Sequence, residues 1–283
     1  MLFLTAYPSI RLSAQTVDQL ALRFAGMTAV TGLEQAMTDS LLALLPGSVR
    51  DRAGNVTVTL GDGAPRRLAT CGLDEVGYVV GNVRDDGFLT LRRVGAATPE
   101  YPLFDQQLEG HRVTVFGGRG AVPGVVAVRS VHLTRGRVGP TTPDPPFTVD
   151  NAYVDVGATS AAQAKALGLA VLAPVALTKR PTLYGEGERL LAAPFAGRRA
   201  ACAALAAAAL AKPTVRGTVV AAFTVQSLLG DAGEKVVERL AGPFDDTRTA
   251  ALSVRYPGTA VETVSLAAAD SLARELVQWM EGR

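Results

Sequence analysis

One ten-residue stretch, Leu68–Gly77, places the strongest constraint on how this chain folds. An apolar run ends there in the small pair Cys71-Gly72, two carboxylates follow at Asp74 and Glu75, and apolar sequence resumes at Tyr78. This pattern predicts a strand that delivers two acidic side chains to the edge of a sheet, followed by a new strand. Because sites in open α/β sheets form outside the carboxyl ends of strands, we look for chemistry at this point of the chain.

The pattern of apolar residues and turn residues changes twice along the chain, and these changes indicate two domains. Before residue 76 and after residue 185, helical periodicity alternates with apolar runs, which predicts an α/β domain with a mostly parallel sheet flanked by helices. Between residues 76 and 185, short strands and frequent turns predict a small inserted β-barrel. The first domain is therefore expected to be discontinuous, at 1–75 and 186–283, and truncated near 243–250.

Spacing and turn signals place the elements of the α/β domain. The predicted helices cover Thr16–Met27, Leu33–Leu45, Phe195–Lys212, Asp231–Leu240 and Ser265–Met280, and the predicted strands cover Val56–Leu60, Thr218–Val225 and Ala250–Val254.

Composition excludes several classes of protein. With 283 residues, 48% hydrophobic and 19% charged, the chain is expected to be globular, and a net charge of +2 without a basic stripe gives no reason to expect a nucleic-acid partner. No apolar run reaches the roughly 18 residues of a membrane span. The N-terminus lacks the basic start of a signal peptide, so we expect a cytoplasmic protein.

Two cysteines, Cys71 and Cys202, are too few for a disulfide framework, and a reducing compartment is the simpler interpretation. We expect Cys71 to be an inert, buried thiol because no His lies near it in sequence to activate it as a nucleophile. Ser227 lacks the Gly-x-Ser-x-Gly context of a hydrolase serine.

The stretch at residues 68–77 resembles the Ala-His-x-Asp-Glu-Ile-Gly motif of the tetrahedral (glutamyl) aminopeptidases, which are dinuclear zinc or cobalt exopeptidases. The resemblance continues through Asp51 to Val56, Gly124 to Leu133 and Asp155 to Ser160. It implies the zinc-aminopeptidase type of α/β fold, an inserted barrel that forms the dimer contact, and two metal ions bound by about five or six ligands.

Residue by residue, the resemblance implies that the metal ligands are lost although their neighbours match. The first His of the family falls on Gly72, the Asp two residues later is retained as Asp74, and the family's Phe-Asp-Asp-Arg falls on Phe195-Ala196-Gly197-Arg198. The general-base Glu and the next ligand Glu fall on Ser227 and Leu228. The family's next ligand, an Asp, belongs to a segment that is shortened in this chain, between Gly242 and Ala250. The family's final His falls on Gly258.

A count of histidines supports this interpretation without any alignment. The chain has two His, His111 and His132, and both lie in the predicted insert. Gly72, Gly197 and Leu228 offer no side-chain lone pair, so a zinc site of the family type is not expected there. Asp74, Glu75 and Ser227 then remain as catalytic positions without a catalytic role.

The expected function is that of a catalytically inactive homologue, a pseudoenzyme, that acts by assembly or by ligand binding. We expect no cofactor, a homo-oligomer formed through the β insert, and an active paralogue or a peptide as further candidate partners. One alternative is an active metallo-aminopeptidase with a rebuilt site, which would need zinc or cobalt. The other is a module that binds a peptide end in the old cleft.

Overall fold

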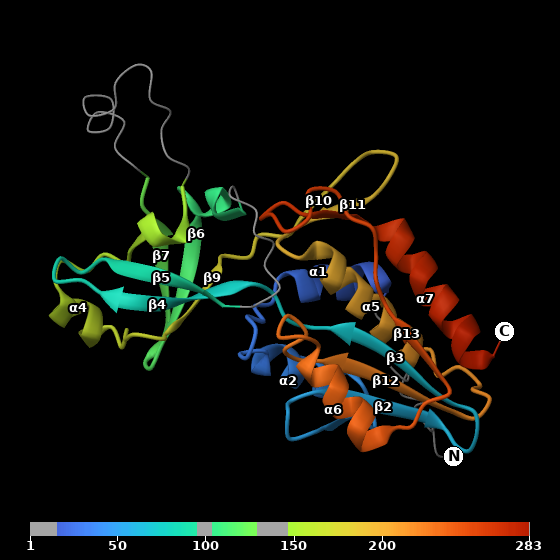
Figure 1. Cartoon of the computed structure of the whole chain (residues 1–283). Coiled ribbons are helices and arrows are strands. Elements are labelled where there is room, and N and C mark those ends of the chain that lie inside the picture. Colours follow the sequence, from blue (N-terminus) through green and yellow to red (C-terminus); the bar gives the residue numbers. More distant parts are fainter. Residues whose placement is uncertain (1–15, 95–103, 129–146, 283) are drawn as a thin grey trace, which may run out of the picture.

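The computed structural model describes residues 16–94, 104–128 and 147–282, and it divides into an α/β part and a barrel (Figure 1). The barrel lies to one side of the α/β part, and the chain enters it after β3 and leaves it after β9. His132 lies outside the described residues. The segment 243–250, where a truncation was predicted, lies within them. No helix in the described ranges is both long and apolar enough to cross a membrane.

A five-stranded sheet forms the centre of the α/β part, in the order β1-β2-β12-β3-β13. Its strands are β1 (Val49–Arg50), β2 (Val56–Gly61), β3 (Arg66–Gly72), β12 (Thr218–Thr224) and β13 (Asp246–Thr249). β12 and β13 run parallel to β3, while β2 is antiparallel to both β1 and β12. The sheet is therefore mixed rather than mostly parallel, because β1 and β2 form a hairpin and no helix crosses between them.

Helices cover the two faces of this sheet unequally. α1 (Val17–Ala25), α5 (Ala196–Leu210) and α7 (Leu266–Glu281) pack together on one face, and the main core lies beneath them. α6 (Ala232–Ala241) covers the other face with a small cluster of its own around Val237, while α2 (Gln35–Leu44) lies beside β1 and β2 (Figure 1). Alanine fills most of α5, so this helix can approach its neighbours closely.

The inserted barrel is closed, with strand order β4-β5-β8-β7-β6-β9. Its strands are β4 (Gly77–Val83), β5 (Leu89–Val94), β6 (Arg112–Gly117), β7 (Gly120–Val126), β8 (Tyr153–Asp155) and β9 (Pro174–Leu177). The short helix α4 (Ala161–Ala166) and two 3-10 turns, η1 (Phe104–Leu108) and η2 (Val149–Asn151), complete it. Inward-facing residues of the strands contribute to a separate apolar core inside the barrel.

A second, three-stranded sheet stands between the barrel exit and α7. It consists of β10 (Thr182–Tyr184), β11 (Leu190–Ala192) and β14 (Thr263–Ser265), all antiparallel. The predicted strand at Ala250–Val254 is wrong, since the strand ends at Thr249 and the following residues leave the sheet. Apolar residues there line a cavity instead of pairing in a ladder, which explains the apolar pattern.

Candidate functional site

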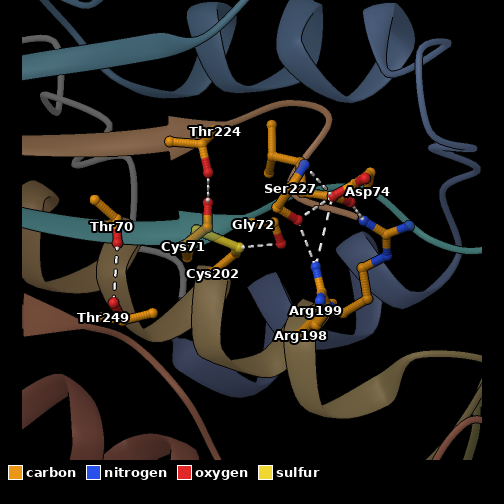
Figure 2. The surroundings of a disulfide bond; sticks show 11 residues. Thr70, Cys71, Gly72, Asp74, Arg198, Arg199, Cys202, Thr224, Ser227 and Thr249 are labelled. Atoms are coloured by element: carbon orange, nitrogen blue, oxygen red, sulfur yellow. Dashed lines mark hydrogen bonds and ion pairs between the residues drawn. A yellow bond between two sulfur atoms is a disulfide. The ribbon is translucent and has the colours of Figure 1, made fainter. Parts of the chain in front are cut away.

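The carboxylate of Asp74 lies just beyond the end of β3 and is fully buried. The hydroxyl of Thr31 and the amide of Leu228 donate to its Oδ2 at 3.0 and 2.9 Å. The amide of Ser227 donates to Oδ1 at 3.0 Å, and the Ser227 hydroxyl donates to the same oxygen (Figure 2). Both oxygens of Asp74 are thus engaged by the protein itself.

Arg198, in the first turn of α5, fills the space next to this carboxylate (Figure 2). Its Nη1 donates to Ser227 Oγ at 2.6 Å and lies 3.5 Å from Asp74 Oδ1. A Cβ atom added to Gly72 would lie 2.4 Å from Ser227 Oγ and 2.9 Å from Arg198 Nη1. Gly72 is therefore the residue that makes room for the Arg198 and Ser227 side chains.

Gly197 and Gly258, far apart in sequence, are brought together by one carboxylate. Glu262, which is 6% exposed, accepts the amide hydrogens of Gly197 at Oε1 and of Gly258 at Oε2, each at 2.9 Å. A Cβ on Gly197 would lie 2.4 Å from Val254 Cγ1, and Ala196 before it is fully buried. A protein carboxylate thus occupies the amino end of α5, where an anion is favoured.

Side chains around these positions enclose a cavity of about 310 Å³. We call it the Asp74 cavity because Ser227 and Arg198, which contact Asp74, line it, although Asp74 itself does not. Gly72, Gly197, Arg198, Ser227 and Glu262 line it. Burial raises the pKa of Glu234, another lining carboxylate, with the charges of Asp231 and Glu238 acting in the same direction.

The backbone around the Asp74 cavity holds unusual conformations. Phe195, Gln226, Asp231 and Tyr256 all have positive φ, between 53° and 57°, although none is glycine. Each stands within a few residues of a position that lines the cavity or corresponds to a family ligand. Such backbone conformations are sparsely populated by L-residues and gather at functional sites. Four of the six positive-φ non-glycine residues among the described ones therefore gather around the Asp74 cavity.

Glu75 points away from this cavity into a buried ion cluster. Its Oε2 accepts hydrogen bonds from Lys179 Nζ at 2.6 Å and Arg199 Nη2 at 2.9 Å, and its Oε1 accepts from the amide of Ala29 at 3.2 Å. Burial raises the pKa of Glu75, but the two cations outweigh it and hold that pKa below 4.5. Burial lowers the pKa of Lys179, and only part of this is offset by Glu75.

Cys71 of β3 and Cys202 of α5 form a disulfide, with their Cα atoms 5.4 Å apart (Figure 2). The expectation of two unpaired thiols is therefore wrong, although both cysteines are buried at 1% exposure. The two residues are 131 positions apart, and only the packing of α5 on β3 brings them into contact. Cys71 lines the Asp74 cavity next to Gly72.

The structure thus joins most of the positions marked in the sequence. Gly72, Asp74, Ala196, Gly197, Ser227, Leu228 and Gly258 lie in or against one site, whereas Glu75 belongs to a separate ion cluster. Across residues 16–94, 104–128 and 147–282, no three His, Cys, Asp or Glu side chains gather as a metal-binding group. His111 precedes β6 of the barrel and does not line the Asp74 cavity.

Sequence reasoning did not single out Lys179, Arg199 or Glu262. One signal was present for Arg199: it is one of two charged residues in a helix that is otherwise made of Ala, Leu, Gly and Cys, and a buried cation needs a partner. Lys179 and Glu262 carry no comparable local pattern, because their partners lie 104 and 65 residues away.

Comparison with known proteins places most of this chain in one protein family. The model of the M42 glutamyl aminopeptidase family matches residues 54–243. The SgcX protein of Escherichia coli K12 is 30% identical over 165 residues, which are 56% of this chain and 42% of that protein. The lysyl aminopeptidase of Pyrococcus furiosus is 27% identical over 142 residues, or 50% of this chain and 38% of that enzyme. These matches span about two fifths of each curated relative.

Solved structures share the fold at low sequence identity. The TET1 peptidase of Pyrococcus horikoshii superposes with a TM-score of 0.77 at 18% identity, covering 94% of this chain and 99% of that one. The aminopeptidase APDkam598 of the archaeon Desulfurococcus kamchatkensis gives 0.75 at 16% identity, covering 94% and 95%. The arrangement of sheet, helices and inserted barrel is therefore the one these peptidases have.

Proposed function

Because this chain belongs to the M42 glutamyl aminopeptidase family, we propose that it is a homologue without catalytic activity, which acts by assembly or by ligand binding. One observation carries the proposal: Arg198 and Ser227 fill the space beside Asp74, and Gly72 has no room for a larger side chain. The protein itself has taken over the interactions that a ligand of Asp74 would make.

The donor set beside Asp74 does not suit a pair of metal ions. Zinc in a hydrolytic site takes about three protein ligands, with a position left for water. Here Gly72, Gly197 and Leu228 supply no side-chain donor, and the oxygens of Asp74 already accept hydrogen bonds. The guanidinium of Arg198 also places a positive charge where a cation would have to enter.

Two measurements test the absence of activity. We expect less than about 0.1 equivalent of zinc, cobalt or manganese per chain by elemental analysis after mild dialysis, and no cleavage of aminoacyl-nitroanilides above background. One or two bound ions per chain, or a metal-dependent rate that disappears in Asp74→Ala, would support the alternative of an active enzyme with a rebuilt site.

Restoring the family ligands offers a second test of the same proposal. The combined change Gly72→His, Gly197→Asp and Leu228→Glu introduces side chains against Ser227 and Val254 and adds buried negative charge. We expect it to lower the free energy of unfolding in chelator by several kcal/mol. A triple variant that unfolds at the wild-type temperature in chelator would show that this site is placed wrongly.

The assembly part of the proposal concerns the barrel as the contact between subunits. The TET1 peptidase of Pyrococcus horikoshii can assemble into a tetrahedron or a large octahedral shell, and its fold is the one found here. We propose that this chain forms a homo-oligomer through its barrel, where Val125 and Tyr153 are exposed apolar side chains on neighbouring strands. Sedimentation as a monomer at micromolar concentration would contradict this, and Val125→Glu should weaken association if it holds.

A further inference from the structure

A second cavity lies where the α/β part meets the barrel, and we call it the junction cavity. Its volume is about 710 Å³, more than twice the 310 Å³ of the Asp74 cavity. None of the residues that line it belongs to the set that corresponds to the family's metal ligands. Its size falls within the range of about 300–1,000 Å³ that is usual for small-molecule sites.

The walls of the junction cavity are largely apolar and come from both parts of the molecule. Met27, Val30 and Val225 contribute from the α/β part, while Phe116 of β6 and Pro174 of β9 contribute from the barrel. Phe116 and Pro174 are only half-buried, so the cavity exposes apolar surface that a ligand would cover. Burial of that surface is a favourable contribution to binding.

Two acidic residues, Glu34 and Asp51, line this largely apolar cavity, and Glu34 is only 4% exposed. Asp51 accepts the amides of Gly54 and Asn55 within its own turn. The amides of Gly32 and Gln226 both donate to Oε1 of Glu34, at 3.0 and 2.8 Å, which holds the carboxylate in place. Among the described residues no cation forms an ion pair with Glu34. Two arginines line the cavity: Arg50 is already paired with Asp39, and Arg52 is exposed to solvent. Burial raises the pKa of Glu34, because its charge has left water without gaining a counter-ion.

We propose that the junction cavity binds a small hydrophobic amine, with its ammonium group against Glu34 and its apolar body between Phe116, Pro174 and Val225. An ammonium ion supplies the counter-charge that Glu34 lacks, and it can donate hydrogen bonds to the carboxylate. A neutral polar group of the same shape in place of the ammonium would supply only a hydrogen bond to Glu34. A negatively charged group there would be repelled by the carboxylate. An amine without an apolar body leaves the walls uncovered.

Three probes that share one aromatic body and differ in the head test this site. We expect 2-phenylethylamine to bind the full chain, and 2-phenylethanol and 3-phenylpropanoate to bind at least tenfold more weakly, by titration calorimetry at neutral pH. Ethylamine, which has the head alone, should also bind at least tenfold more weakly. In amide NMR spectra, the shifts caused by 2-phenylethylamine should fall on Gly32, Gly54 and Phe116 and spare Gly72 and Gly197.

The variant Glu34→Gln keeps an oxygen to accept the Gly32 and Gln226 amides but removes the charge, so we expect at least a tenfold loss of affinity for the amine. Glu234→Gln is the matched control, since burial also raises the pKa of that carboxyl but it lines the Asp74 cavity. It should leave the affinity unchanged. Phe116→Ala gives an independent check from the barrel side and should weaken binding several-fold, even if Glu34→Gln fails to fold.

The inference is overturned if the alcohol or the carboxylate binds as tightly as the amine, if Glu34→Gln or Phe116→Ala leaves the affinity unchanged, or if the shifts fall on the Asp74 cavity. It does not depend on the loss of peptidase activity, because neither Asp74 nor Ser227 takes part in it.

Discussion

Gly72 and Ser227 meet at the end of β3, where the chain has space for the side chain of one of them but not of both. The hydroxyl of Ser227 donates to Asp74 and accepts from Arg198, so it satisfies two charged neighbours at once. A glycine at residue 72 and a serine at residue 227 are therefore a matched pair. A side chain restored at residue 72 alone would collide with Ser227.

At this scale we predict that Gly72→Ala lowers the free energy of unfolding by about 1–3 kcal/mol, because its Cβ would lie 2.4 Å from Ser227 Oγ. In a Ser227→Gly background the same change should cost less than about 1 kcal/mol, since the Ser227 atoms are gone and only Arg198 Nη1, the far end of a flexible side chain, remains close. Urea unfolding of the four proteins of this cycle measures the coupling.

Gly187→Ala serves as the control for that cycle. A Cβ there would meet no atom within 4 Å, so we expect a change within about 0.5 kcal/mol. Equal costs for Gly72→Ala with and without Ser227 would mean that the two side chains do not compete for one space.

The site depends on two segments, β3 with the residues that directly follow it and α5, and four contacts join them. The disulfide joins Cys71 to Cys202, Arg198 lies against Asp74, and Arg199 donates to Glu75 and to the carbonyl of Leu73. The segment closed by the disulfide contains the whole barrel, from β4 to β9. The bond therefore ties the strand that enters the barrel to the helix that follows its exit.

At the element scale we predict that a reductant lowers the free energy of unfolding of the wild-type protein by about 2–4 kcal/mol, because the unfolded chain regains the freedom of a long loop. The variant Cys71→Ala/Cys202→Ala should be less stable than the oxidised wild type and should not respond to reductant. Urea unfolding with and without dithiothreitol measures both effects. Two titratable thiols per chain in denaturant, without reductant, would contradict the disulfide.

An ion cluster of Glu75, Lys179 and Arg199 links the barrel to the α/β part of the molecule. Lys179 follows the last barrel strand, Glu75 precedes the first, and Arg199 belongs to the α/β part. Two buried cations share one carboxylate there, so the removal of Glu75 would leave both without their partner. The removal of Lys179 would leave a balanced pair.

At the scale of the whole molecule we predict that Glu75→Gln lowers the free energy of unfolding at pH 7 by about 3–5 kcal/mol, and that Lys179→Met costs less. The folded state holds the pKa of Glu75 below its ordinary value of 4.5, so the stability that this carboxylate contributes is present above that pH. It is lost as the pH falls and Glu75 becomes protonated. The difference between wild type and Glu75→Gln should accordingly shrink below about pH 4.5.

Urea unfolding between pH 7 and pH 3 checks this dependence. Glu188→Gln is a suitable control because it breaks an exposed ion pair with Arg255, which should change stability by less than about 1 kcal/mol at any of these pH values. A difference between wild type and Glu75→Gln that stays constant with pH would show that Glu75 is not ionised in this cluster.

Much of this fold could be predicted from local patterns. Helical spacing predicted the bounds of α1, α2, α5, α6 and α7 to within a few residues. The short strands and frequent turns that begin at residue 76 predicted the barrel. The strand predicted from the apolar run at 218–225 is present as β12, which is buried and pairs parallel with β3 and antiparallel with β2. The strand predicted at Ala250–Val254 was wrong, because a short apolar segment that lines a cavity has the same composition as a strand.

By itself, the sequence determined the residue types at the positions it marked, because identities such as Gly72, Gly197 and Leu228 do not depend on folding. Only the tertiary structure decided what surrounds them. Ser227 and Arg198 close on Asp74, Glu262 joins Gly197 to Gly258, and the disulfide and the Glu75 cluster link segments more than 100 residues apart. These contacts follow from the packing of α5 and the barrel exit against β3, and no local periodicity encodes which distant partner a buried charge or thiol will meet.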